Sequence, residues 1–140
     1  MDVDELLRQY SAGQRNFHRA KLIGVDLKGV NLRAADLSEA TLIGANLMGA
    51  NLSEANLSEA DLTFSDLSRA HLNQANLCNA NLRGAKLNRA NLTGANLQGA
   101  ILSDVDLNGA NLAGVQMPDE SFNLINSKLD LLSFTGRNLN

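Results

Sequence analysis

The sequence predicts a solenoid, a chain that winds around its own core, and three regularities lead to this prediction. Leucine occupies every fifth position from Leu22 to Leu112, nineteen times without interruption. Two residues before each of these leucines, and before Met117, stands an alanine or a valine, except at Ser65. Nine of the eleven glycines follow such a leucine by two residues. A fixed internal period marks a repeat architecture, so it outweighs local signals for single helices or strands.

A period of five residues fits neither common regular structure. In an α-helix, each step of five would turn the leucine by about 140° around the axis and spread the leucines over all sides. In a flat strand, an odd step would place successive leucines on opposite faces. Only a chain that bends once in every unit can direct all the leucines to one axis. We therefore expect one corner per unit, with the leucines inside.

The glycines indicate the kind of corner. A type II turn needs a positive φ at its third residue, and glycine adopts that conformation without a Cβ clash. Several units carry a charged residue where others have glycine, and for these units we expect a different turn type: Glu39, Glu54, Glu59, Arg69 and Arg89.

Units such as residues 45–49 (ANLMG) and 55–59 (ANLSE) resemble the A(D/N)LXX repeats of the pentapeptide-repeat family. The resemblance extends over twenty-two consecutive units, from residue 15 to about residue 122. It implies an all-β fold, a right-handed quadrilateral parallel β-helix with four units in each turn. It also implies that the leucine and the small residue point inward while the other positions face solvent. We therefore expect one elongated domain whose repeat array spans residues 14–122.

Residues 1–13 are predicted to form a helical cap on this array. Asp2 can cap the start of a short helix, and Glu5 can complete a capping box. Leu6 and Tyr10 share one face of the helix, and a glycine follows at its end. Such a cap would cover the leucine-filled cross-section and the unpaired edge of the first coil, which would otherwise favour end-to-end aggregation.

Residues 123–140 make up the third segment, after Pro118 has interrupted the pattern near the end of the array. The five-residue spacing can resume there out of phase, which would give a degenerate final coil. The alternative is a short helix capped by Ser127, with Asp130 at its third position. Both alternatives stay open, and in either form the segment can serve as a homodimer contact.

If twenty residues make one turn, side chains twenty positions apart stack on each other. The residues before the leucines then form four columns, and most of these residues are asparagine or aspartate. We expect stacked amides to exchange hydrogen bonds along these columns. Lys86 falls between Asp66 and Asp106 in one column, where it can pair with both as a structural contact.

One column departs from asparagine on nearly every coil: Lys21, Thr41, Asp61, Asn81, Ile101 and Ser121. On the same side, Ile23 and Ile43 are predicted to stack, with Met48 around the next corner. A contiguous apolar cluster rimmed by polar groups is typical of a binding surface. The candidate protein-interaction patch consists of Ile23, Thr41, Ile43, Met48, Phe64 and Ile101. Repeat drift on a stable scaffold is the alternative explanation, and for Phe64 the alternative is local packing beside Ser65.

The sequence favours no catalytic, cofactor or metal site. His18 and His71 stand on different sides of the predicted coil, whereas a zinc site needs three or four converging ligands. Cys78 is the only cysteine, and no basic residue is placed to activate it. We find no nucleophile with an evident histidine and acid partner, and the filled interior leaves no pocket for a substrate. We therefore expect a protein that is not an enzyme and binds no cofactor.

The net charge is -3, from fifteen acidic and twelve basic residues, and this balance disfavours general nucleic-acid binding. No run of eighteen apolar residues indicates a membrane helix. The first residues, MDVDELLRQY, are acidic where a secretory signal would be basic. We therefore expect a cytoplasmic protein that binds neither nucleic acid nor membranes.

Two functions are consistent with these features. The first is an interaction or scaffold module that presents a rigid surface to an unknown protein partner. The second is a DNA-mimicking inhibitor of DNA gyrase or a related topoisomerase, which the resemblance suggests because some members of the family have this activity. Mimicry requires continuous negative potential, so we favour the first function. Basic residues interrupt the acids along the array: Arg19, Lys28, Arg33, Arg69, Arg83, Lys86 and Arg89.

Overall fold

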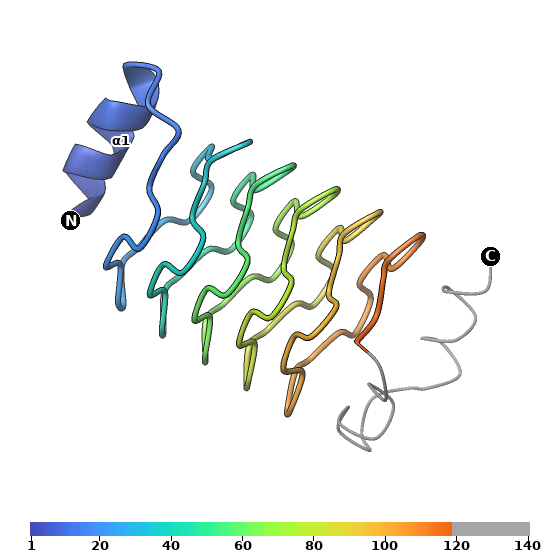
Figure 1. Cartoon of the computed structure of the whole chain (residues 1–140). Coiled ribbons are helices and arrows are strands. Elements are labelled where there is room, and N and C mark those ends of the chain that lie inside the picture. The colour runs from blue at the N-terminus through green and yellow to red at the C-terminus, as the bar shows by residue number, and fades with distance from the viewer. Residues whose placement is uncertain (119–140) are drawn as a thin grey trace.

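The computed structural model describes residues 1–118, which form one helix followed by a stack of coils (Figure 1). The helix α1 spans Val3–Ser11. Within the described residues, no helix is long and apolar enough to cross a bilayer. The predicted segment 123–140, with its two alternative forms and its dimer contact, lies outside the described residues, as do the last residues of the predicted array.

Parallel β-bridges join successive coils. Each bridge connects a residue before a leucine with the residue twenty positions later, from Asn16↔Asp36 to Asn96↔Gln116. Twenty residues therefore make one coil, as predicted, and five complete coils run from residue 16 to residue 115. In this part of the chain the pairing consists of isolated bridges, because the backbone turns again after each unit.

The leucines fill the interior of the coil. From Leu22 to Leu112, every leucine at the five-residue spacing is at most 3% exposed. The small residues from Ala35 to Ala110 are buried as well. At about 2 kcal/mol for each buried leucine, this column is the main favourable term of the fold.

All twenty corners use the same backbone conformation, so the prediction of a different turn type at the charged positions is wrong. The residue at the glycine position has a positive φ whether it is Gly49 (67°) or Glu39 (57°), Glu54 (60°) or Arg69 (60°). In each corner the N–H of the following small residue donates to the leucine carbonyl three residues earlier, as in Ala40 to Leu37 (3.0 Å). Hydrogen bonds to the neighbouring coil hold the strained conformation, which costs a residue with a Cβ about 1 kcal/mol or more.

In units with a coil on each side, backbone hydrogen bonds between coils use three of the five N–H groups. In the unit 45–49, Leu47 donates to Asp66 O (2.7 Å) and Gly49 donates to Ser68 O (2.9 Å) in the next coil. Asn46 donates to Val25 O (2.9 Å) in the preceding coil. The turn uses a fourth N–H, that of the small residue. Only the N–H of the residue after the leucine has no backbone acceptor.

The side chain before the leucine supplies the missing acceptor. In the same unit, the N–H of Met48 donates to Asn46 Oδ1 (3.1 Å). All fifteen asparagines and aspartates at this position accept the equivalent bond. The expected exchange of hydrogen bonds between stacked amides is therefore wrong, because each side-chain oxygen turns back to its own backbone. Asparagine and aspartate recur because a short side chain with an oxygen is needed there.

The helix α1 is held at both ends and lies against the first coil. Asp2 Oδ1 accepts from the N–H of Glu5 (2.8 Å), as predicted, but the Glu5 carboxylate accepts from Gln9 Nε2 (3.1 Å) instead of completing a capping box. Leu6 is fully buried, and the Tyr10 hydroxyl donates to Arg33 O (2.8 Å) in the first coil. The helix therefore covers the end of the core, as the cap prediction expected.

We predict that Leu67→Asp prevents the array from folding. Leu67 is fully buried in the leucine column, so the substitution would place an unpaired carboxylate in an apolar interior. The expected loss of unfolding free energy is more than about 4 kcal/mol. Thermal and urea unfolding followed by circular dichroism measure it, with Leu67→Met as a control that should cost less than about 1.5 kcal/mol. An unaltered melting curve for Leu67→Asp would contradict the assigned core.

We predict that Ser65→Ala stabilises the protein. Ser65 is fully buried among alanines and valines, and its Oγ has no hydrogen-bond partner among the described residues. Removal of this hydroxyl should raise the unfolding free energy by about 1 kcal/mol. The measurement is again thermal unfolding, with the half-buried Ser68 replaced by alanine as the matched control. A decrease in stability for Ser65→Ala would mean that the hydroxyl has a partner after all.

Candidate interaction surface

Equivalent corners of successive coils stack along the rod and form its four edges. We define a corner as the four residues from the one before the leucine to the second residue after it. The first corner contains residues 16–19, the second 21–24, the third 26–29 and the fourth 31–34, each with its equivalents at steps of twenty residues.

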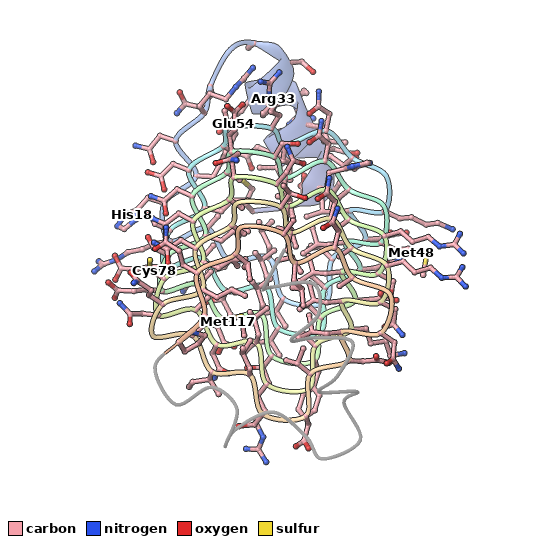
Figure 2. The ribbon with its side chains drawn as sticks, turned by 90° about the vertical axis from the view of Figure 1, so that its right-hand side faces the viewer. His18, Arg33, Met48, Glu54, Cys78 and Met117 are labelled. Carbon is pink, nitrogen blue, oxygen red and sulfur yellow. The ribbon has the colours of Figure 1, made fainter. Side chains whose placement is uncertain are left out.

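Figure 2 views the stack nearly end-on and separates these corners. His18 and Cys78 of the first corner lie on the side opposite Met48 of the third corner. Arg33 and Glu54 mark the fourth corner, near α1. The interior between the corners is occupied by the leucines, so any surface that binds a partner lies on the outside.

The second corner carries the exposed apolar residues of the array. Among the described residues from 16 onward, the large apolar side chains with high exposure are Ile23 (64%), Phe64 (65%) and Ile101 (44%). All three belong to the second corner, as do the half-buried Thr41 and Ile43. The structure thus brings these five members of the predicted patch to one edge of the rod.

Met48 does not belong to this edge. It lies on the third corner and is half-buried there, next to charged side chains. This agrees with the sequence prediction, which placed Met48 around the next corner from Ile43, and its membership of the interaction patch stays a prediction.

Phe64 both packs locally and faces solvent. Its backbone φ is 57°, and its ring atoms Cδ1 and Cε1 lie beside Gly84 on the next coil, where an added Cβ would be only 2.4 Å from Phe64 Cδ1. The side chain nevertheless leaves most of its surface exposed. The two alternatives for Phe64 are thus compatible, and the glycine twenty residues later is the sequence signal for the packing.

The second corner also lacks side-chain acceptors for its backbone. Lys21, Thr41 and Ile101 replace asparagine or aspartate before the leucine. As a result, the N–H groups of Ile23, Ile43 and Ser103 have no hydrogen-bond acceptor within residues 1–118. The sequence identified this column as irregular, but the consequence depends on a hydrogen bond that only the structure reveals. Apolar side chains and unpaired N–H donors therefore occur on the same edge.

The first corner contains a serine, a histidine and an acid in contact, which the sequence did not indicate. His18 Nδ1 lies 2.8 Å from Ser38 Oγ, and His18 Nε2 lies 3.2 Å from Glu39 Oε2. The sequence predicted no nucleophile with a histidine and an acid partner. This prediction is wrong, because a serine, a histidine and a glutamate lie close together here. The Ser38 hydroxyl, however, donates to Asp36 Oδ1 (2.5 Å), so it offers no proton to the imidazole.

This cluster joins the first two coils. Asp36 accepts from both the side chain and the N–H of Ser38, and these bonds, mainly the side-chain one, lower the pKa of the Asp36 carboxyl below its ordinary 3.8. Arg19 pairs with the outer oxygen of Glu39 (3.4 Å). His18 lies between the Ser38 hydroxyl and the Glu39 carboxylate on an exposed corner. Because the Ser38 proton goes to Asp36, the arrangement is an electrostatic clamp and not a nucleophilic site.

The third corner contains an open depression of about 700 Å³. Arg69, Lys86 and Arg89 line it together with Asp66 and Asp106. Lys86 forms no ion pair with either aspartate within the described part of the chain, so the predicted pairing is wrong.

The two aspartates instead accept hydrogen bonds from uncharged donors. Asp106 accepts from Asn88 Nδ2 (2.7 Å) and from the N–H of Asn108 (3.0 Å). Asp66 accepts from the N–H of Ser68 (2.9 Å). The three cations of the depression are thereby left without a carboxylate within 4.0 Å among residues 1–118.

The remaining candidate residues do not converge on a metal site. Within residues 1–118, no group of three histidine, cysteine, aspartate or glutamate side chains is arranged to hold a metal ion. His71 is exposed on the fourth corner, and Cys78 is a half-buried free thiol on the first.

The comparisons with known proteins agree with this architecture. The family described as pentapeptide repeats matches residues 16–53, 55–94 and 90–119, in eight copies. A solved pentapeptide-repeat protein from the cyanobacterium Cyanothece 51142 is 33% identical, with a TM-score of 0.51 over 81% of this chain and 97% of that one. Another, from the thylakoid lumen of Arabidopsis thaliana, is 29% identical, with a TM-score of 0.58 over 84% of each chain. The comparison with curated proteins found no match.

The clamp of the first corner predicts a dependence of stability on pH. Since the folded pKa of Asp36 lies below its unfolded value, the charged form stabilises the fold above that unfolded value, and the gain is lost as the pH falls through the folded pKa. Asp36→Asn keeps the oxygen that accepts from Ser38 but removes the charge. The variant should melt below the wild type at pH 7, and the difference should shrink at about pH 3. Melting curves at both pH values check this, and an equal difference at both would contradict it.

Proposed function

This chain belongs to the pentapeptide-repeat family, and on that premise we propose that it is a non-enzymatic protein-interaction module. The right-handed, four-sided winding that the family resemblance implies is part of this proposal. The second corner is the surface that meets the partner. The observation that carries the proposal is that the strongly exposed large apolar side chains of the described array, Ile23, Phe64 and Ile101, all lie on this one edge. Exposed apolar groups gathered on one surface are typical of protein-binding sites.

Two further properties support a binding role for this edge. The unpaired N–H groups of Ile23 and Ile43 can donate to a partner's carbonyl or carboxylate oxygens, so the surface offers polar as well as apolar contacts. Each coil is hydrogen-bonded to the next, which keeps the edge rigid before a partner arrives. A rigid surface loses little conformational entropy on binding.

The filled interior of the described coils supports a non-enzymatic role. Leucines and alanines close the interior of every described coil, and the depression on the third corner is open and shallow. The serine and histidine of the first corner stand on an exposed edge, with the serine proton directed to Asp36. None of these places encloses a reacting group away from water.

The alternative is a DNA-mimicking inhibitor of DNA gyrase or a related topoisomerase. A DNA mimic needs continuous negative potential along the rod. Here the basic side chains Arg69, Lys86 and Arg89 occupy adjacent positions on one corner, which weighs against mimicry. An assay of DNA supercoiling by purified gyrase distinguishes the two functions, since inhibition at stoichiometric protein would favour the mimic.

The test of the interaction module is a pull-down with Ile23→Ser plus Ile43→Ser. Serine occupies the same unit position natively at Ser53 and Ser58, so the double variant should fold. We expect recovery of the bound partner to fall by about tenfold or more, because the variant removes the apolar contacts at the N-terminal end of the edge. Asn73→Ser plus Thr93→Ser makes the equivalent change on the fourth corner and should retain the partner. Equal recovery with both double variants would reject the second corner as the binding surface.

A further inference from the structure

We propose that the depression on the third corner binds a carboxylate side chain from an acidic segment of a protein partner. This inference concerns a different surface from the apolar edge and does not depend on it. It rests on three features of the described residues: a local excess of positive charge, a backbone donor without an acceptor, and an open space of suitable size.

The positive charge comes from three side chains that form no ion pair within residues 1–118. Arg69 and Arg89 stand on successive coils, and Lys86 lies beside them. By contrast, Arg19 and Arg33 on other corners pair with Glu39 and Glu54. Guanidinium groups form their strongest hydrogen bonds with carboxylates and phosphates, so Arg69 and Arg89 are free to hold such a group.

The unsatisfied donor lies in the same place. Because Lys86 replaces asparagine or aspartate, the N–H of Asn88 has no acceptor within residues 1–118. In fifteen other units a side-chain oxygen occupies this position, as Asp66 Oδ1 does for Ser68 (2.9 Å). Asn88 Oδ1, by contrast, is a buried acceptor without a donor in the described part of the molecule, so it takes no part in holding the carboxylate. The depression thus lacks the oxygen that the rest of the array supplies from its own chain.

The charge of the lining residues favours a carboxylate over a nucleic acid. Three cations face two aspartates, so the lining has an excess of one positive charge. One carboxylate neutralises that excess. A duplex nucleic acid carries about one negative charge per 1.7 Å of axis, and its further phosphates would meet Asp66 and Asp106. The depression measures about 700 Å³, and the half-buried Met48 provides an adaptable apolar contact for an aliphatic neighbour of the acidic residue.

The test uses the full chain and a fluorescein-labelled peptide of sequence ELEELE, with binding measured by fluorescence anisotropy. The neutral peptide QLQQLQ is the reference ligand. We expect the acidic peptide to bind at least about tenfold more tightly than the neutral one. Inorganic phosphate and a short single-stranded oligonucleotide serve as competitors at the same concentration as unlabelled acidic peptide.

Two variants remove the proposed contacts. The double variant Arg69→Gln plus Arg89→Gln should weaken binding of the acidic peptide by about tenfold or more. It should fold, because Gln74 already occupies an equivalent position with a φ of 61°. Lys86→Asn should also weaken binding, since it removes a cation and gives the Asn88 N–H an intramolecular acceptor. The same substitution should raise the melting temperature, which separates lost binding from damaged structure.

The matched control is Lys21→Gln plus Arg83→Gln, which removes two positive charges from the second corner and should change binding by less than about twofold. The proposal is overturned if the neutral peptide binds equally well, or if the control weakens binding as much as the third-corner variants. Stronger competition by phosphate or the oligonucleotide than by the acidic peptide would overturn it too. Ile23→Ser plus Ile43→Ser should leave this binding unchanged, so the two surfaces can fail or succeed separately.

Discussion

The structure depends on a complete pairing of backbone N–H groups within a unit of five residues. Two bonds go to the next coil, one goes to the preceding coil and one closes the turn, as Leu47, Gly49, Asn46 and Ala50 illustrate. The fifth N–H is paired only if the residue before the leucine carries a side-chain oxygen. An unpaired polar group near the interior is costly, so this requirement restricts the sequence of each unit as strongly as the leucine does. It also holds residues such as Glu39 and Arg69 in a backbone conformation that their Cβ atoms disfavour.

The same pairing makes departures from the repeat informative. Where Lys21, Thr41 and Ile101 stand, the second corner gains unpaired donors beside exposed apolar side chains. Where Lys86 stands, the third corner gains an unpaired donor beside unpaired cations. If such a substitution were only neutral sequence drift, the side chains around it would be the same as elsewhere on the rod. In these two places the missing oxygen and the surface chemistry coincide, and this coincidence connects the fold to the proposed functions.

The apolar side chains lie in the core and the polar chemistry lies on the edges, and this separation follows from the size of the residues. Leucine and alanine fill the interior so completely that chemistry is confined to the outside, where groups are separated by the spacing of about 4.8 Å between coils. Charges placed on successive coils can therefore pair, as Arg33 and Glu54 do on the fourth corner and His18 and Glu39 do on the first. Contacts of this kind stabilise the N-terminal coils modestly, since exposed ion pairs contribute at most about 1 kcal/mol. The cations further along the rod have no such pairs within the described residues and are available to a ligand.

The family resemblance supplied the coil of twenty residues and the inward small residues. The sequence by itself determined one corner per unit, the inward leucines and the helix that covers the first coil. These features repeat along the chain or depend on near neighbours, so a period and a cap residue such as Asp2 are sufficient to predict them. Only the tertiary structure decided that Glu39 and Gly49 share one turn conformation, that Asn46 accepts from its own backbone and that His18 contacts Ser38. Each of these depends on the direction of a particular N–H or side chain at a corner shared by two coils. A five-residue period specifies which residues are neighbours but not the direction in which their polar atoms point.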